Sequence, residues 1–169
     1  MSFDATGQTF VLNQKLISVS GDLWIDDSSG NHAFEVDGKL LAVRRTLFLK
    51  DPAGNQLYEI NKSLAHLHQT FEVKKGDEVV ATIQKALVNI LGDRFNVTLA
   101  NGDQLAVKGD WIAREFHISQ AGSDVIFASR RLLSIRDSYG VQVTPGFETP
   151  LALAIVIALE QIELEDKHQ

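Results

Sequence analysis

Short stretches in which apolar and polar residues alternate recur along most of the chain. Phe95, Val97 and Leu99 alternate with polar residues, and Phe71 and Val73 do the same. This period of two is typical of strands with one buried face. Turn-forming sequences separate these stretches, at residues 26–31, 37–38, 51–55, 75–77, 101–103, 109–110, 121–123 and 138–140. We expect ten or more strands joined by hairpins, in an antiparallel sandwich or barrel.

The last part of the chain breaks this pattern and predicts a helix over residues 151–164, LALAIVIALEQIEL. Thr149 suits the N-cap and Pro150 the first helical position, and no turn signal follows before Asp166. Apolar residues cover every face of this helix, so it has to be surrounded. They are Leu151, Leu153, Ile155, Val156, Ile157, Leu159 and Ile162. A flat sheet would cover only one side, and we therefore expect the strands to close around the helix.

The apolar run at residues 151–159 is too short to cross a membrane. Nine helical residues rise about 13 to 14 Å, whereas the hydrocarbon core of a bilayer is about 30 Å thick. The sequence therefore predicts no transmembrane segment. The N-terminal stretch MSFDATGQTF lacks the basic and apolar regions of a secretory signal. We expect a cytoplasmic protein, with peripheral contact to a membrane left open.

Composition narrows the classes of function. The 169 residues, 44% of them apolar, suit one domain over residues 1–169. The absence of cysteine excludes disulfides, thiolate metal sites, thiol nucleophiles and S-acylation. A formal net charge of -6 opposes nonspecific binding to nucleic acid, although a local basic patch could still bind it. We predict no nucleic-acid partner.

Several motifs follow one another along the chain: Gly30-Asn31 through Phe34, Val36 and Gly38; Leu49, Asp51 and Gly54 with Leu57-Tyr58-Glu59-Ile60; Gly109-Asp110-Trp111 with Arg114-Glu115-Phe116; and Asp137 to Val141, followed by Pro145-Gly146 and the LALAIVIALEQI helix. Their order resembles that of the LURP-one-related family, which includes the bacterial YxjI-like proteins. The resemblance implies a tubby-C-terminal-like fold, a closed antiparallel barrel of about twelve strands around a central C-terminal helix, similar to phospholipid scramblases. Tubby relatives bind phosphoinositide headgroups and scramblase relatives work at membranes, but the resemblance assigns no ligand residues here.

Three arginines share the apolar parity of their predicted strands. Arg45 aligns with Leu41, Val43, Leu47 and Leu49; Arg114 with Ile112, Phe116 and Ile118; and Arg131 with Val125, Phe127, Leu133 and Ile135. An inward-facing charge is costly unless it is paired. One interpretation is an anion site at a barrel mouth, where guanidinium groups hold a phosphate or carboxylate. The alternatives, which we favour, are a β-bulge that changes the parity or an internal ion pair with Glu148 or Glu160. We predict that at least one of the arginines lies near Glu160.

Other clusters of polar residues carry weaker hypotheses. Arg44-Arg45 and Arg130-Arg131, with Lys50 and Arg136, offer a basic face for lipid headgroups. However, adjacent strand residues point to opposite faces, so a solvated barrel exterior is the better interpretation. His66 and His68 project to one face of a predicted strand, but no third ligand accompanies them, and we predict no metal site.

No motif commits the chain to catalysis. It contains no Gly-rich phosphate loop, no HExxH sequence and no nucleophile elbow. Asp137 with Tyr139, or Glu115 with His117, suit structural roles better than acid and base roles. We therefore predict no enzyme and no cofactor. The predicted function is a noncatalytic binding module for phospholipid or phosphoinositide headgroups or another anionic small ligand. The alternative is a protein-interaction scaffold or regulatory protein with no small-molecule ligand.

Overall fold

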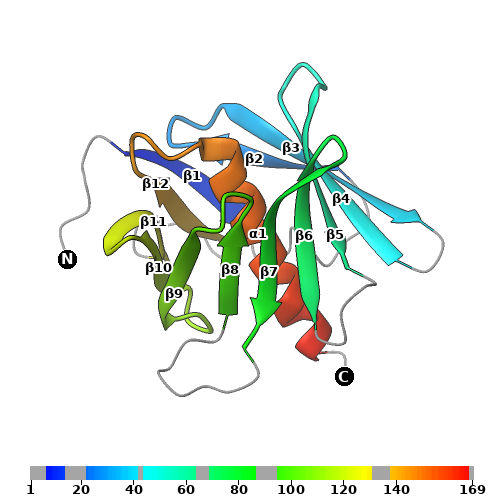
Figure 1. Ribbon diagram of the computed structural model, residues 1–169. Coiled ribbons are helices and arrows are strands. Elements are labelled where there is room, and N and C mark those ends of the chain that lie inside the picture. Colours follow the sequence, from blue (N-terminus) through cyan, green and yellow to red (C-terminus); the bar gives the residue numbers. More distant parts are fainter. Residues whose placement is uncertain are drawn as a thin grey trace.

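The alternating stretches form twelve antiparallel strands in the computed structural model, and one helix follows them (Figure 1). The structure describes residues 7–13, 22–41, 44–63, 69–86, 95–130 and 138–167. The strands are β1 (Gln8–Asn13), β2 (Asp22–Asp27), β3 (His32–Leu41), β4 (Arg44–Lys50), β5 (Gln56–Lys62), β6 (Thr70–Lys75), β7 (Glu78–Lys85), β8 (Phe95–Leu99), β9 (Gln104–Asp110), β10 (Glu115–Gln120), β11 (Ser123–Ser129) and β12 (Ser138–Val143), and the helix is α1 (Thr149–Lys167).

Each strand pairs with the next along the chain, and β1 pairs with β12 to close the barrel. In this closing pair Phe10 lies opposite Val141 and Leu12 lies opposite Tyr139. All four side chains are buried, because the inward parity of both strands faces the interior. The predicted antiparallel barrel is therefore confirmed.

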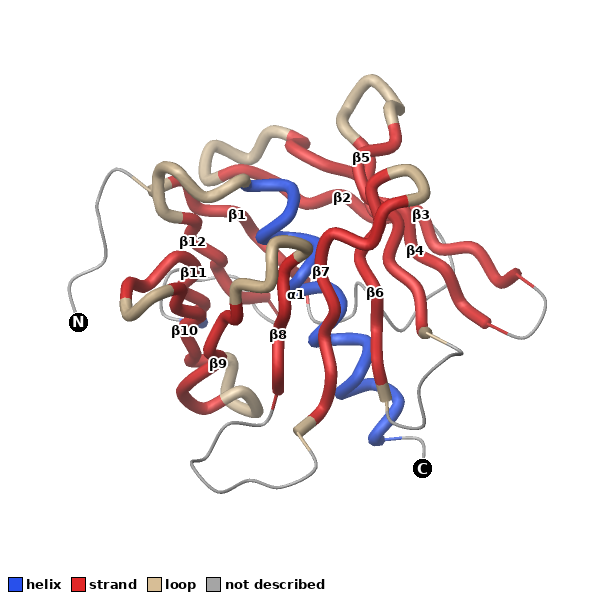
Figure 2. The backbone as a smooth tube through the Cα atoms, viewed as in Figure 1, coloured by secondary structure: helices blue, strands red, loops and turns tan. Residues whose placement is uncertain are grey.

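Helix α1 passes through the barrel, and strands surround it (Figure 2). The apolar residues named above are fully buried from Leu153 to Ile162, and Leu151 at the entrance is half-buried. The prediction that the strands enclose this helix is confirmed. The helix extends to Lys167, three residues beyond the predicted end. No helix in the described part of the chain is long and apolar enough to cross a membrane.

Two predicted strand parities are wrong. Ile112 was expected to face inward, but residues 111–114 form the turn between β9 and β10, and the Ile112 side chain is 64% exposed. In β11 Val125 is buried as expected, but the register with β10 shifts between Ile118 and Ser119, which is the β-bulge considered above as an alternative. Beyond this shift the inward residues are Ile126 and Ala128, and Ala128 lies opposite the buried Phe116. Phe127 therefore faces outward, contrary to the predicted alignment with Arg131.

Candidate functional site

The two ends of the barrel differ in how they meet the helix. We call the end where α1 begins, at Thr149, the open end, and the end defined by Arg114, Tyr139 and Glu160 the closed end. At the closed end charged side chains from the strands bind the helix. At the open end a cavity lies beside it.

At the closed end Arg114 makes a two-point ion pair with Glu160. Arg114 Nε donates to Glu160 Oε1 and a terminal guanidinium nitrogen donates to Oε2, each at 2.8 Å. The other terminal nitrogen donates to the Trp111 carbonyl at 2.8 Å. Both charged side chains are only 7% exposed. The parallel hydrogen bonds fix the pair and occupy most of the guanidinium donors inside the protein.

Tyr139 of β12 is the third member of this cluster. Its hydroxyl donates to Glu160 Oε1 at 2.6 Å, and the side chain is 1% exposed. Burial raises the pKa of Tyr139 well above its usual value, and the charge of Glu160 and the hydrogen bond to it add to the shift. The phenol therefore stays protonated and acts as a fixed donor.

The turn between β9 and β10 positions Arg114. Trp111 is buried and lies under the guanidinium, whose carbon is 4.8 Å from the ring centroid. Asp110 Oδ1 accepts from the backbone N–H of Ala113 at 3.0 Å. Arg114 itself has a φ of 58°, a left-handed conformation that is rare for a residue with a side chain. The buried ion pair and the anchored tryptophan hold this turn in its strained shape.

The predicted contact between an arginine and Glu160 is confirmed, and Arg114 makes it. The interpretation that fits Arg114 is the internal ion pair, since its donors point to Glu160 and to backbone carbonyls rather than into a cavity. Arg45 lies in β4, but its side chain is outside the described part, and Arg131 lies wholly outside it. Glu148, the other acidic candidate, is at the open end, where it accepts from the Tyr58 hydroxyl at 2.6 Å.

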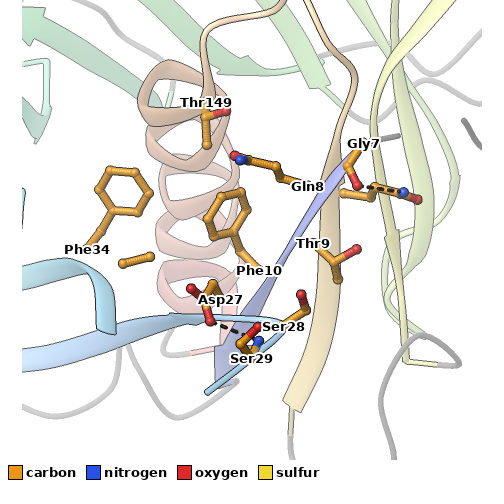
Figure 3. Close-up of a pocket in the computed structure, with 11 residues that line it drawn as sticks. Gly7, Gln8, Thr9, Phe10, Asp27, Ser28, Ser29, Phe34 and Thr149 are labelled. Atoms are coloured by element: carbon orange, nitrogen blue, oxygen red, sulfur yellow. Dashed lines mark hydrogen bonds between the residues drawn. The ribbon is translucent and has the colours of Figure 1, made fainter. Parts of the chain in front are cut away.

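A cavity of about 680 Å³ lies at the open end between α1, β1 and the turn from β2 to β3 (Figure 3). Its origin is the seam between β1 and β2. In the described residues β1 pairs with β12 at six positions but with β2 at two, Phe10 with Asp27 and Val11 with Asp26. Gln8 and Thr9 extend beyond the end of β2, opposite turn residues, and the sheet is left open there.

The cavity lining combines neutral hydrogen-bonding groups, two aromatic rings and one carboxylate. The described lining residues are Gly7, Gln8, Thr9, Phe10, Asp27, Ser28, Ser29, Ala33, Phe34, Gln142 and Thr149. Thr149 begins the helix, so the partial positive charge of the helix N-terminus lies at the cavity wall. Gln142 is held in place, because its amide donates to the Gly7 carbonyl at 3.2 Å.

Asp27 is positioned by the turn it begins. Its Oδ1 accepts from the backbone N–H groups of Ser29 at 2.9 Å and Asn31 at 3.0 Å. Its own N–H donates to the Asn31 carbonyl at 2.8 Å, and Gly30, with a φ of 86°, closes the turn. No residue in the described ranges donates to Asp27 Oδ2. The carboxylate is thus fixed at the cavity with one oxygen available to a ligand.

Two smaller hollows, of about 310 and 160 Å³, flank the contact between Tyr58 and Glu148 on another side of the helix start. Lys75 lines both. Tyr58 is buried, and burial followed by the hydrogen bond and charge of Glu148 raises its pKa far above the usual value. The hollows show that the open end is recessed on more than one side of α1.

The weaker hypotheses from the sequence have mixed outcomes. Lys50 of the proposed basic face bonds Asp37 at 2.8 Å, which suits a solvated exterior. Glu115 accepts from Ser129 at 2.6 Å and from the Arg130 backbone, as a structural residue does. His66 and His68 lie outside the described residues, as does Asp137. Within the described ranges no three potential ligands gather around a metal position.

The cavity residues were missed at the sequence level for a physical reason. Asp27 was recognised only as part of a turn, and β1 carried no polar signal that distinguished it from other strands. What brings them together is the closure of β1 on β12, a contact between residues more than 120 positions apart. The one local signal is Thr149-Pro150, since this sequence predicts a helix start and anions are favoured at helix N-termini.

Comparison with known proteins agrees with the fold. The family model described as LURP-one-related matches residues 8–160. The X-ray structure of a protein from Arabidopsis thaliana superposes with a TM-score of 0.68 at 18% sequence identity, covering 93% of this chain and 91% of that one. No curated protein matches the chain.

Proposed function

The chain belongs to the LURP-one-related family, and we propose that it is a noncatalytic binding module that holds a phospholipid headgroup, or another small ligand with an anionic group, in the open-end cavity. The observation that carries the proposal is the cavity of about 680 Å³ beside the start of α1. This volume lies within the range of small-molecule sites. A cytoplasmic protein that contacts membranes peripherally would meet such a ligand.

The lining supports a ligand with one phosphate group. The helix N-terminus and the hydroxyls of Thr9, Ser28 and Ser29 can donate hydrogen bonds to phosphate oxygens. Among the described lining residues there is no lysine or arginine, so the extra charges of a phosphoinositide would be left uncompensated. A monophosphate headgroup therefore fits the cavity better than a phosphoinositide does.

The proposal that the module is noncatalytic rests on the contacts made by the two tyrosines with raised pKa values. Tyr139 and Tyr58 have strongly raised pKa values, yet each hydroxyl is committed to a glutamate within the protein. Glu160 is in turn bound by Arg114. These contacts hold the helix in the barrel rather than presenting a nucleophile or base to the cavity.

Thermal unfolding in the presence of glycerol 3-phosphate tests the proposal, with glycerol at matched ionic strength as the reference. A ligand that binds only the folded state stabilises it by about 2.7 kcal/mol at a hundred times its dissociation constant, so the midpoint should rise by several degrees. Ser29→Glu, which adds a carboxylate to the lining, should abolish the rise. Ser123→Glu, at the exposed first residue of β11, should preserve it. No rise with the unmodified chain would overturn the proposal.

The second candidate is a protein-interaction scaffold, and an exposed aromatic surface favours it. Trp24 is 37% exposed and stacks on His32 with 4.4 Å between ring centroids. Asp26 fixes His32 through a contact of 2.7 Å. Rigid exposed aromatic side chains are frequent anchors of protein interfaces. A partner identified by cross-linking should lose affinity for Trp24→Ala but not for Ile112→Ala, whereas equal affinity for both variants would oppose this surface.

A further inference from the structure

We infer that the open-end cavity contains a subsite for an alkylammonium group, formed by Asp27, Phe10 and Phe34, so that its ligand carries a positive as well as a negative charge. The inference rests on the proposed function, because it specifies the ligand of the same cavity. In the view of Figure 3 Thr149 and Asp27 lie at opposite ends of the site, and the rings of Phe10 and Phe34 lie between them.

The first observation is the charge of the lining. Asp27 is the one ionisable side chain among the described residues that line the cavity. Its turn fixes Oδ1 through two backbone N–H groups, whereas no described residue donates to Oδ2. A half-buried carboxylate with a free oxygen attracts a cation, and a purely anionic ligand would be repelled by it.

The second observation is the aromatic wall beside this carboxylate. The rings of Phe10 and Phe34 lie 5.8 Å apart between centroids, at an angle of 57°. Phe10 also lies directly opposite Asp27 in the pairing of β1 with β2. Aromatic faces attract cations and accommodate the methyl groups of a quaternary ammonium, a combination that aromatic cages for choline use.

The third observation is the placement of the opposite charges. Thr149 brings the partial positive charge of the helix N-terminus to the same cavity, while Asp27 supplies the negative charge. Methylene groups between the charged ends of a ligand would meet the apolar side chains of Ala33 and Phe34. The chemistry that matches is a phosphate joined to an alkylammonium by a short carbon spacer, as in a phosphocholine ester.

Isothermal titration of the full chain with three probes tests the inference: glycerophosphocholine, glycerol 3-phosphate and choline chloride. Glycerophosphocholine should bind about ten times more tightly than glycerol 3-phosphate, because it alone uses both ends of the cavity. Asp27→Asn should reduce the affinity for glycerophosphocholine to that for glycerol 3-phosphate. Phe34→Leu should weaken the binding of glycerophosphocholine and of choline, but not that of glycerol 3-phosphate.

The chain offers a matched control in Asp51, which begins a second turn of the same design. Asp51 Oδ1 accepts from the Asn55 N–H at 2.8 Å, and Gly54 donates to the Asp51 carbonyl, as Gly30 does to that of Asp27. Asp51 lines none of the three cavities described above. Asp51→Asn removes the same charge from an equivalent turn, and it should leave the preference for glycerophosphocholine unchanged.

The possible outcomes separate the inference from the proposed function. Equal affinity of the unmodified chain for glycerophosphocholine and glycerol 3-phosphate would overturn the ammonium subsite and leave the anion site intact. If choline binds as tightly as glycerophosphocholine and glycerol 3-phosphate does not bind, the result would support the subsite and oppose the proposed function. Binding of none of the probes would overturn both. Sedimentation with phosphatidylcholine vesicles then tells a lipid from a soluble ester, and either source supports the inference.

Discussion

Both ends of the barrel use the same contact, a tyrosine hydroxyl that donates to a glutamate at 2.6 Å, but with different surroundings. At the closed end Tyr139 meets Glu160, which is buried and also bound by Arg114. At the open end Tyr58 meets Glu148, which is exposed and borders two hollows. The difference shows that one end fixes the helix while the other leaves room beside it. Stability should therefore be concentrated at the closed end and ligand binding at the open end.

Arg114→Ala should have the largest effect on stability, because it leaves the carboxylate of Glu160 inside the barrel without its ion-pair partner. Removal of one partner of a buried ion pair costs about 3 to 5 kcal/mol in the free energy of unfolding. Lys108→Ala removes a charge from an exposed position on β9 and should change stability by less than about 0.5 kcal/mol. Urea unfolding followed by circular dichroism measures both. Similar losses in the two variants would show that the closed end is not the stabilised one.

Two glycines allow the backbone of the two ends to be compared. A Cβ on Gly109 at the closed end would lie 2.6 Å from the Glu115 carbonyl oxygen, and its φ is 110°. A Cβ on Gly30 at the open end would meet nothing within 4 Å, although its φ is 86°. We expect Gly109→Ala to cost more than about 2 kcal/mol, from strain and steric overlap together, and Gly30→Ala about 1 kcal/mol from strain alone. Chemical denaturation decides this, and a larger loss at Gly30 would reverse the comparison.

The two tyrosines differ by the same logic. Tyr139→Phe should cost about 1.5 to 3 kcal/mol at neutral pH, because Glu160, a buried charged acceptor, loses one of its donors. Tyr58→Phe should cost about 1 kcal/mol, since water can reach Glu148. Urea unfolding of each variant beside the unmodified chain measures the difference, and an equal cost at the two ends would contradict it.

The pH dependence of stability follows from the raised tyrosine pKa values. The pKa of both tyrosines is raised in the folded protein, so above about pH 10 the unfolded chain releases these protons while the folded one retains them. The contribution of these tyrosines to the free energy of unfolding should therefore be constant below about pH 10 and decrease above it. Unfolding measured from pH 8 to pH 11 should show a shallower alkaline loss for Tyr139→Phe than for the unmodified chain. An identical slope would mean that Tyr139 ionises in the folded protein.

The sequence predicted the barrel and its helix because both depend on local patterns. Alternation in stretches such as Phe71 to Val73 identifies a strand without knowledge of its neighbours, and an apolar helix after Thr149 requires enclosure whatever the order of strands. Arg114 could be placed near Glu160 because buried charges need partners. The predicted inward orientation of Ile112 was wrong because a four-residue turn interrupts the alternation. The cavity could not be predicted from the sequence, since it depends on how far β1 extends beyond the end of β2.

The smallest effect is expected for Ile112, although it lies within the turn that carries Arg114 at the closed end. Its side chain is 64% exposed, and the turn is held by Trp111 and Arg114 on either side of it. Ile112→Ser should therefore change the free energy of unfolding by less than about 0.5 kcal/mol, whereas Val107→Ser, at a buried position of β9, should cost several times more. Urea denaturation of the two variants separates the inner and outer surfaces of the closed end. A large loss for Ile112→Ser would show that the tip of the turn, and not only the ion pair behind it, holds the helix in place.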